Sequence, residues 1–438
     1  MNKMSDYNTT VEFLFSSLPM YQRTGQAAYK ANLDNTHALD KALGHPHRNF
    51  KTIHIAGTNG KGSVSHMLAS IFQEAGYKTG LYTSPHLMDF RERIRVGGKM
   101  IREEQVVNFV NKIRDEIDVI KPSFFEMTVA MAFDHFAEEK VDIAIIETGM
   151  GGRLDSTNII TPLASLITSI SIDHALFLGN TELLIAREKG GIIKNGVPVV
   201  IGKNDQEICR LFSEMAEERQ ANILFAERER SFSYLTFSQD QLACFHFRNF
   251  PNRHPEVIRT DLPGRYQHEN ISVVLTTIGL LQRSGWNIPQ DSVNKGFSKV
   301  KKNTSLLGRW DILGANPRII ADTAHNKAGI LAVMEQLLEI PSKKLHIIWG
   351  MVNDKQVEEI FDCLPGDATY YFTEPSIPRA MPVSVLTERA LALGFSGKPY
   401  KSVPEAYRAA LESAGPEDTI FVGGSTFVVG DLFVSLYK

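Results

Sequence analysis

The chain has 438 residues, with 47 basic (Lys, Arg) and 50 acidic (Asp, Glu) side chains and a formal charge of −3. Hydrophobic residues make up 43% and charged residues 22%, which is typical of folded proteins and excludes a largely disordered chain. The near-neutral charge gives no sign of the basic surface that binds nucleic acid, so we expect no nucleic-acid partner.

The amino-terminal segment contains only the short apolar run "VEFLF", with no basic stretch leading into a long apolar one. We therefore expect neither a signal peptide nor a membrane span, and no membrane partner. Cys209, Cys244 and Cys363 are odd in number and far apart, which argues against a disulfide framework and for a reducing compartment. Together these features predict a cytoplasmic protein.

Short apolar, β-branched runs recur along the chain, each followed by polar or glycine-rich residues and then by a helical stretch. They lie at 52–56, 141–146, 163–170, 197–201, 318–321, 345–349 and 419–422. Buried parallel strands have this pattern, and their alternation with helices predicts a doubly wound α/β sheet. Ligands of such sheets bind beyond the carboxyl ends of the strands, so the residues after each run are candidates for the site.

The length predicts two or three domains, and a basic, turn-rich segment near residue 300 separates two series of strands and helices. We expect residues 1–300 to form a phosphate-loop mononucleotide-binding domain with a doubly wound parallel sheet. Residues 301–438 should form a smaller, Rossmann-like α/β domain. Between 229 and 262 the chain alternates apolar and polar residues about Gln239 and Asp240, which predicts a small antiparallel hairpin attached to the first domain.

The segment "TIHIAGTNGKGSVSHML" (52–68) joins the first strand through a glycine-rich turn to a helix with apolar residues at helical spacing over 63–76. Backbone N–H groups of such a turn bind phosphate, and a lysine adds a positive charge. The predicted nucleotide-phosphate site comprises Gly57, Thr58, Asn59, Gly60, Lys61, Gly62 and Ser63. The alternative is a surface turn that happens to contain lysine. The generic phosphate loop has Ser or Thr directly after its lysine, whereas Gly62 intervenes here, and we expect it to let the turn open before the helix begins.

Other candidates follow the later strands. Glu147 could hold Mg²⁺ at the end of its strand, or could simply be solvated there. His174 is a lone histidine, more often structural, and Lys189 by composition alone is typical of an exposed helix lysine. Arg309 could contact a phosphate and Asp322 a ribose hydroxyl, with a plain ion pair as the alternative for each.

Taken in order, the motifs "AGTNGKGS", "YTSPHL", "RERIRV", "SFFE", "ETGMGGRLDSTN", "TSISIDH", "EKGGIIK", "GR" at 308–309 and "DTAHN" resemble one family. It is the folylpolyglutamate synthase and dihydrofolate synthase family, a branch of the Mur-like ligases. The resemblance runs from about residue 30 to the end of the chain and is thinnest over 203–262. The glycine after the loop lysine is a feature of this folate branch.

The resemblance implies ATP in the phosphate loop, with Lys61 on the β- and γ-phosphates. It implies that Asn270 contacts adenine, Arg309 a phosphate and Asp322 the nucleotide, while His325 faces the phosphates. Lys61, Lys189, Arg309 and His325 are thereby the predicted catalytic residues.

The resemblance also implies a metal site and an acid-binding site. The ligands of two Mg²⁺ ions would be Ser84, Glu147, His174 and Lys189, the lysine as a carbamate. The residues that line the pterin-bearing substrate would be Asn32, Leu33, Ser123, Phe124, Phe125, Glu126, Leu154, Asp155 and Ser156.

The implied reaction is the ATP-dependent addition of L-glutamate to dihydropteroate, to reduced folate or to both, through an acyl phosphate. We expect a monomeric, bifunctional dihydrofolate synthase/folylpolyglutamate synthase that acts on small molecules. One alternative is a monofunctional folylpolyglutamate synthase, and another, of a different class, is a phosphate-loop switch ATPase, which predicts the standard loop spacing. A peptidoglycan-precursor Mur ligase is less favoured because only 56 residues precede Gly57.

Overall fold

The computed structural model describes residues 4–19, 32–250, 254–353 and 357–437. Its contacts divide the chain into two compact units, the first formed by 1–261 and 267–305 and the second by 262–266 and 306–438. The border that we expected lay between residues 300 and 301, and the roles assigned to the two domains stay predictions.

The first unit is built on an eight-stranded sheet with the order β4-β3-β2-β5-β1-β6-β7-β8. Its strands are β1 (Lys51–Ala56), β2 (Thr79–Tyr82), β3 (Ile94–Val96), β4 (Lys99–Met100), β5 (Ile143–Glu147), β6 (Ala164–Ile167), β7 (Val199–Ile201) and β8 (Ile223–Phe225). The neighbouring strands in the series β2-β5-β1-β6-β7-β8 are all parallel. At one edge of the sheet, β3 pairs antiparallel with both β2 and β4. The doubly wound parallel sheet is thus confirmed, with an antiparallel edge that we did not predict.

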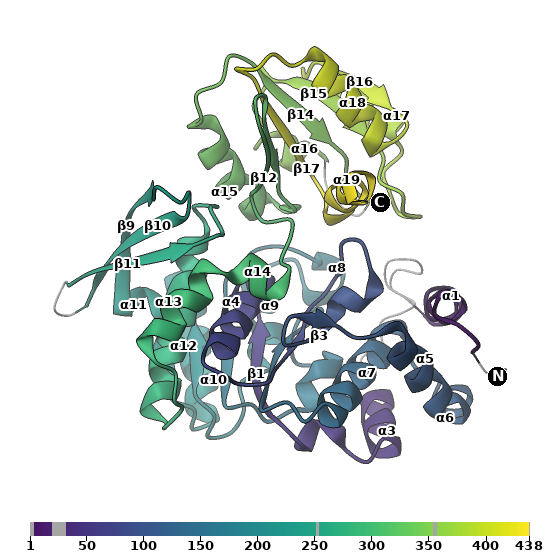
Figure 1. The fold of residues 1–438 in the computed structure, drawn as a ribbon, viewed down its shortest axis with the longest axis vertical. Helices are drawn as coiled ribbons and strands as arrows, with labels where there is room; N and C mark the ends of the chain where they lie inside the picture. The colour runs from purple at the N-terminus through teal and green to yellow at the C-terminus, as the bar shows by residue number, and fades with distance from the viewer. Residues whose placement is uncertain (1–3, 20–31, 251–253, 354–356, 438) are drawn as a thin grey trace. The chain divides into compact units, whose positions relative to one another are not determined.

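Helices cover the sheet of the first unit (Figure 1). They are α1 (Tyr7–Ser17), α3 (Asp34–Ala42), α4 (Lys61–Glu74), α5 (Glu103–Lys112), α6 (Arg114–Ile120), α7 (Phe124–Glu138), α8 (Ala175–Leu178), α9 (Glu182–Gly190), α10 (Gln206–Glu218), α11 (Ala226–Glu229), α12 (Gln267–Arg283), α13 (Gln290–Ser298) and α14 (Val300–Thr304), with 3-10 turns η2 (Pro46–Arg48), η3 (Phe90–Arg93) and η4 (Ser156–Ile159). Helix α4 contacts β1, β2 and β5 on one side and α12, α13 and α14 on another, so it is buried throughout 63–72. The phosphate loop therefore leads into a helix that is buried along most of its length.

A small antiparallel sheet is attached to the first unit. It consists of β9 (Arg230–Phe237), β10 (Ala243–Asn249) and β11 (Pro255–Thr260) in the order β11-β10-β9. The hairpin predicted about Gln239 and Asp240 is confirmed as β9 and β10, and β11 adds a third strand.

The second unit has a six-stranded sheet with the order β12-β13-β17-β14-β15-β16, in which only β12 is antiparallel. Its strands are β12 (Asp311–Ala315), β13 (Arg318–Ala321), β14 (Leu345–Trp349), β15 (Thr369–Thr373), β16 (Gly397–Tyr400) and β17 (Thr419–Gly423), and its helices are α15 (Lys327–Leu338), α16 (Val357–Phe361), α17 (Val383–Ala392), α18 (Val403–Ser413) and α19 (Thr426–Tyr437). The three apolar runs expected after residue 300 are β13, β14 and β17. The smaller Rossmann-like α/β domain is therefore confirmed as a fold.

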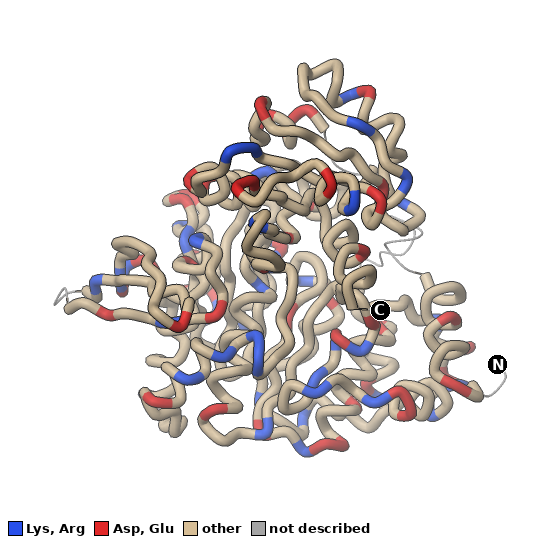
Figure 2. Tube along the Cα trace, turned by 45° about the horizontal axis from the view of Figure 1, so that its top comes forward, with Lys and Arg blue, Asp and Glu red and all other residues tan. Residues whose placement is uncertain are grey.

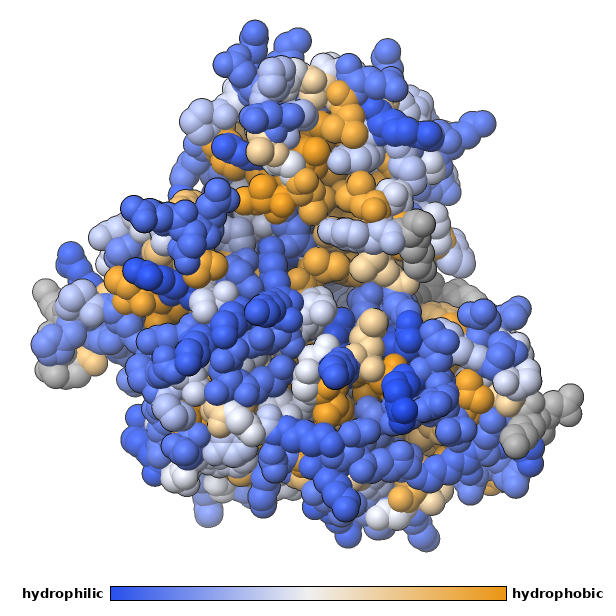
Figure 3. Space-filling view, in the orientation of Figure 1, coloured by the Kyte–Doolittle hydropathy of each residue, from blue (hydrophilic) through white to orange (hydrophobic). Residues whose placement is uncertain are grey.

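Surface chemistry adds little to this picture. Acidic and basic residues are interspersed along the trace of each unit (Figure 2). The face of the first unit seen in Figure 3 is mostly hydrophilic. Among the described residues, no helix is both long and apolar enough to cross a membrane.

Candidate active site

Four neighbouring strands of the first unit end at the same edge of the sheet. In the parallel register Tyr82 lies opposite Ile146, Ile55 opposite Glu147, and Ala56 opposite Ile167. Glu147 is the last residue of β5, and the loops after the other three strands carry Ser84, the phosphate-binding residues and His174. Segments far apart in sequence thus meet where ligands of such sheets bind.

The phosphate loop holds two glycines in conformations that other residues rarely adopt. Gly57 has φ 146° and Gly60 has φ 90°. A Cβ on Gly57 would lie 1.9 Å from Oγ1 of Thr168, and one on Gly60 would lie 2.1 Å from Oδ1 of Asn270. Both glycines are therefore required by close neighbours as well as by the backbone.

Helix α4 begins at Lys61, with Gly60 as its left-handed amino-terminal cap. Gly62 lies inside the first helical turn, so the expectation that it lets the turn open before the helix begins is wrong. The residues with positive φ in this loop are Gly57 and Gly60.

Two lysines donate to the same carbonyl of this loop. Nζ of Lys61 donates to the carbonyl oxygens of Gly57 at 3.0 Å and Thr58 at 3.1 Å, and Nζ of Lys189 donates to that of Gly57 at 2.7 Å. Burial, together with the smaller effect of the charge of Lys61, lowers the pKa of Lys189 to about 7. The exposed helix lysine expected from composition is therefore wrong: Lys189 is buried beside the phosphate loop, and much of its amine is neutral near pH 7.

Two of the predicted metal ligands lie close together. Glu147 is buried, and the backbone N–H of Ser84 donates to its Oε2 at 3.4 Å. His174 has φ 52° and precedes α8 as its cap residue. In the part of the chain that the structure describes, no three His, Cys, Asp or Glu residues are grouped to hold a metal. Of the four predicted Mg²⁺ ligands, Glu147 and His174 belong to these residue types, and the other two are a serine and a lysine.

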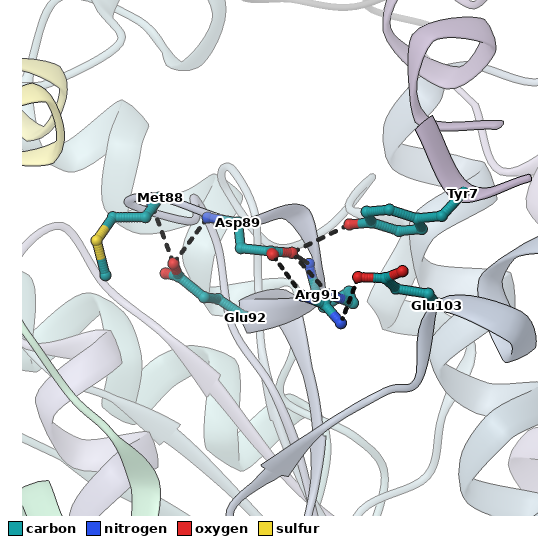
Figure 4. Close-up of polar contacts among 6 residues, drawn as sticks. All are labelled: Tyr7, Met88, Asp89, Arg91, Glu92 and Glu103. Atoms are coloured by element: carbon teal, nitrogen blue, oxygen red, sulfur yellow. Dashed lines mark hydrogen bonds and ion pairs between the residues drawn. The ribbon is translucent and has the colours of Figure 1, made fainter. Parts of the chain in front are cut away.

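The loop after β2, which carries Ser84, is held by one carboxylate. Glu92 accepts hydrogen bonds from the backbone N–H groups of Leu87, Met88 and Asp89, each at 2.9 Å. Figure 4 shows those from Met88 and Asp89. Asp89 in turn caps η3 and accepts a hydrogen bond from the hydroxyl of Tyr7 at 3.0 Å. The sequence motif "RERIRV" marked this segment, but nothing in it showed that Glu92 fixes the loop.

The predicted acid-binding residues lie on adjoining elements. Ser123 caps α7, its N–H donates to Oε2 of Glu126 at 2.6 Å, and the amide of Asn35 donates to the same oxygen at 3.2 Å. Helix α3, which follows Asn32 and Leu33, contacts α6, α7 and η4. The structure therefore brings the segments 32–33, 123–126 and 154–156 onto neighbouring elements.

Asp155 is buried and already has several partners. Its carboxylate accepts hydrogen bonds from the N–H groups of Gly149 and Met150, each at 2.9 Å, and from the N–H of Thr157 at 3.0 Å. Burial raises the pKa of Asp155, and these hydrogen bonds oppose that shift. The carboxylate thus shapes the glycine loop after β5, where the ring of Phe125 lies 2.3 Å from a Cβ built on Gly149.

In the second unit the predicted residues gather around the end of β13. Asp322 is buried, and its Oδ2 accepts hydrogen bonds from the hydroxyl of Tyr266 at 2.6 Å and the N–H of Trp310 at 2.8 Å. Burial raises the pKa of Asp322, and the hydrogen bond from Tyr266 opposes the shift. The sequence analysis missed Tyr266, although it lies only four residues before the predicted Asn270.

Arg309 and His325 both contact Thr323. Arg309 donates to the hydroxyl of Thr323, and also to the carbonyl of Gly308 at 3.0 Å. Nδ1 of His325 lies 3.0 Å from the carbonyl oxygen of Thr323. Arg309, Asp322 and His325 are thus grouped within one unit.

A glutamine that the sequence analysis missed joins Asn270 to the phosphate loop. The side-chain amide of Asn270 donates to Oε1 of Gln267 at 2.7 Å, and that of Gln267 donates to Oγ of Ser63 at 3.2 Å. The spacing of 267 and 270 places both on one face of α12, which is the signal that could have identified Gln267.

Two family profiles match the chain. Residues 55–278 match the profile described as "Mur ligase middle domain", and residues 308–426 match "Mur ligase, glutamate ligase domain". The dihydrofolate synthase/folylpolyglutamate synthase of Bacillus subtilis is 31% identical over 92% of this chain and 94% of its own length.

Solved structures of proteins with these names are also similar to this chain. E. coli FolC in complex with DHPP and ADP is 26% identical, with a TM-score of 0.84 over 100% of this chain and 99% of that one. A bifunctional folylpolyglutamate synthase/dihydrofolate synthase from Yersinia pestis, complexed with AMPPNP and Mn, is 26% identical, with a TM-score of 0.83 over 100% of both chains.

Proposed function

Since the chain belongs to the folylpolyglutamate synthase and dihydrofolate synthase family of Mur-type ligases, we propose that it adds L-glutamate to dihydropteroate and to reduced folate. It is an ATP-dependent amide ligase that acts on small molecules. The observation that best supports this reaction is the arrangement of the phosphate loop. Lys61 and the buried Lys189 both donate hydrogen bonds to the carbonyl of Gly57. The strand before this loop, β1, pairs with β5, which ends at Glu147.

A carboxylate is a poor electrophile at neutral pH, so its oxygen must first be converted into a leaving group. The carboxylate of the acid attacks the γ-phosphorus of ATP, the bond to the β-phosphate oxygen breaks, and an acyl phosphate and ADP form. The amine of L-glutamate then attacks the acyl carbon, loses a proton and expels inorganic phosphate, which leaves the amide.

The residues of the phosphate loop have the first part in this reaction. The N–H groups at the start of α4 and the ammonium of Lys61 bind the phosphates of ATP and offset the charge that develops on them. A single donor of this kind contributes about 3–4 kcal/mol to the transition state, and holding the reactants in line contributes roughly 7–11 kcal/mol.

The chain uses a nucleotide and a divalent metal. We assign Ser84, Glu147, His174 and Lys189 as the residues that hold two Mg²⁺ ions, with Lys189 as a carbamate. Bound Mg²⁺ would reduce the repulsion between the phosphate oxygens and the carboxylate. The lowered pKa of Lys189 favours carbamate formation, because only the neutral amine reacts with CO₂. The carbamate would also replace a like-charged neighbour of Lys61 with an opposite one.

The remaining roles follow the positions of the residues. We assign Asn270, Arg309 and Asp322 to the nucleotide and His325 to its phosphates. We assign the acid to Asn32, Leu33, Ser123, Phe124, Phe125, Glu126, Leu154, Asp155 and Ser156. We further propose that the chain acts as a monomer in the cytoplasm.

One assay separates the candidate functions. The purified chain is incubated with ATP, L-glutamate and Mg²⁺ together with either dihydropteroate or tetrahydrofolate, and products are resolved by mass. Glutamylation of both acids is expected. Product from tetrahydrofolate alone would indicate a monofunctional folylpolyglutamate synthase, and ATP hydrolysis indifferent to acid and glutamate would indicate a switch ATPase.

A further inference from the structure

Arg93, at the end of η3, is a buried cation that forms no ion pair with any carboxylate in the part of the chain that the structure describes. Its side chain is 3% exposed, and Nε donates to Nδ1 of His86 at 2.9 Å. The uncharged hydroxyl of Tyr82 is a second polar side-chain neighbour of the guanidinium. A buried guanidinium stays charged and is costly unless it is paired, so its surroundings require explanation.

The arginine two residues earlier shows the usual arrangement. Arg91 is paired with Asp89 at 2.7 Å and with Glu103 at 3.1 Å, and it lies over the ring of Tyr7 (Figure 4). The charge of Arg91 is therefore met by two carboxylates in a partly exposed position. Arg91 thus has two anionic partners, Asp89 in its own loop and Glu103 at the start of α5, whereas no carboxylate of the described residues forms an ion pair with the more deeply buried Arg93.

The contacts of Arg93 do not neutralise it. Because Nδ1 of His86 accepts the hydrogen bond, the imidazole carries its proton on the other nitrogen and is neutral. On another side the guanidinium lies 5.3 Å from the centre of the Phe124 ring, a cation–π contact that weakens but does not cancel the charge. Burial lowers the pKa of Arg93, and Tyr82 with the nearby carboxylates Glu92 and Glu147 opposes the shift.

The location of Arg93 indicates the missing anion. It lies over the ring of Phe124, in the segment assigned to the acid, and it is close enough to Glu147, assigned to the metal, for the charge of Glu147 to raise its pKa. If Glu147 binds a cation, two positive charges lie near each other, and an anion is required between them. In the proposed reaction the group at that place is the carboxylate of the acid, which becomes the acyl phosphate.

We propose that Arg93 binds the reacting carboxylate of the acid substrate and retains it as the acyl phosphate forms. This inference rests on the proposed function. The guanidinium supplies hydrogen-bond donors for an oxyanion in a site already shielded from water, where charge-assisted hydrogen bonds are strongest. Arg93 is then a catalytic residue whose buried charge does not stabilise the fold while the substrate is absent.

The test compares Arg93→Met with the matched control Arg91→Met. Binding of dihydropteroate and of its neutral carboxamide is measured by fluorescence titration, together with nucleotide binding and the melting temperature. The wild type and Arg91→Met should prefer the carboxylate by about 10- to 100-fold. Arg93→Met should lose this preference, bind nucleotide normally, and melt no lower than the wild type, because apolar replacement of an unpaired buried charge is often neutral or stabilising.

An undiminished preference for the carboxylate in Arg93→Met would overturn the proposal. A variant that unfolds would contradict the claim that the charge costs stability, and Arg93→Lys, which keeps the charge but not the fork of donors, then decides. A weakened carboxylate preference in Arg93→Lys supports the proposal, and an unchanged one overturns it. Failure of the wild type to bind either pterin would instead count against the proposed function.

Discussion

Replacing Gly57 with alanine tests whether the phosphate loop needs its close approach to β6. The added methyl group would lie 1.9 Å from Oγ1 and 3.1 Å from Cβ of Thr168, distances that force a displacement. Thr168 cannot yield freely, because its hydroxyl donates to the carbonyl of Asn59 at 2.6 Å. The loop itself must therefore move.

The cost has two parts. Forcing alanine into a backbone conformation that only glycine adopts readily costs about 1–3 kcal/mol. Loss of the Thr168 hydrogen bond adds about 1 kcal/mol. The sum, about 2–4 kcal/mol, is less than the roughly 5–15 kcal/mol that stabilises a typical folded protein. The variant should fold, but a loop displaced by about 1 Å should lower turnover about 100-fold.

The control is Gly76→Ala at the far end of α4. Gly76 has φ 88°, but a Cβ there meets nothing within 4 Å, so this variant has backbone strain without the collision. Nucleotide affinity from titration, turnover and urea unfolding are measured for both variants. Gly76→Ala should lose about 1 kcal/mol of stability and keep normal affinity. Gly57→Ala should show both lower turnover and weaker nucleotide binding; turnover and affinity equal to those of Gly76→Ala and the wild type would refute the reasoning.

Three further changes test the site and one buried carboxylate. Lys61→Ala should lower turnover by orders of magnitude while the melting temperature stays near that of the wild type; near-normal turnover would contradict the phosphate assignment. Lys189→Ala should be inactive and partly recover with added short carboxylic acids, and mass spectrometry that finds unmodified Lys189 in active enzyme would remove the carbamate. Burial raises the pKa of Asp261 from its ordinary value of 3.8 to about 6. Between these two pH values the folded chain keeps a proton on Asp261 that the unfolded chain loses. The stability of the fold therefore falls as the pH rises from about 4 to about 6. In urea titrations, the free energy of unfolding of Asp261→Asn should therefore exceed that of the wild type by about 1–2 kcal/mol near pH 7 and equal it near pH 4. A higher free energy of unfolding at both pH values would assign the effect to another cause.

The strands that the sequence predicted are mostly buried, although β2 and most of β15 are buried as well and were not predicted. The runs that became β1, β5, β14 and β17 are continuous and apolar, and this pattern follows from the helices that cover both sides of a parallel sheet. The edge strand β4 has two residues, both exposed, and β16 contains proline and is only partly buried. Such strands owe their conformation to the neighbour they pair with, so local composition does not reveal them.

The site shows the same limit at the level of side chains. Glycines of the phosphate loop were predictable because their backbone role leaves a mark in the sequence. The carboxylate of Glu92 was not, because its three partners are backbone N–H groups, which every residue except proline carries. Composition alone could not distinguish Lys189 from a surface lysine; the family resemblance singled it out, and the folded chain shows that it is buried.

The division of the chain into units was hardest to foresee. Asp261 belongs to the first unit, residues 262–266 to the second, and Gln267 to the first again. Within these few residues Tyr266 hydrogen-bonds to Asp322 of its own unit, while Gln267 begins α12 and hydrogen-bonds to Ser63. Helical or strand periodicity needs a longer stretch to become visible, so a short excursion of this kind leaves no periodic signal. Only tertiary contacts show that residues 262–266 belong to the second unit. The sequence therefore shows one border near residue 300, whereas the folded chain passes between the two units at three points.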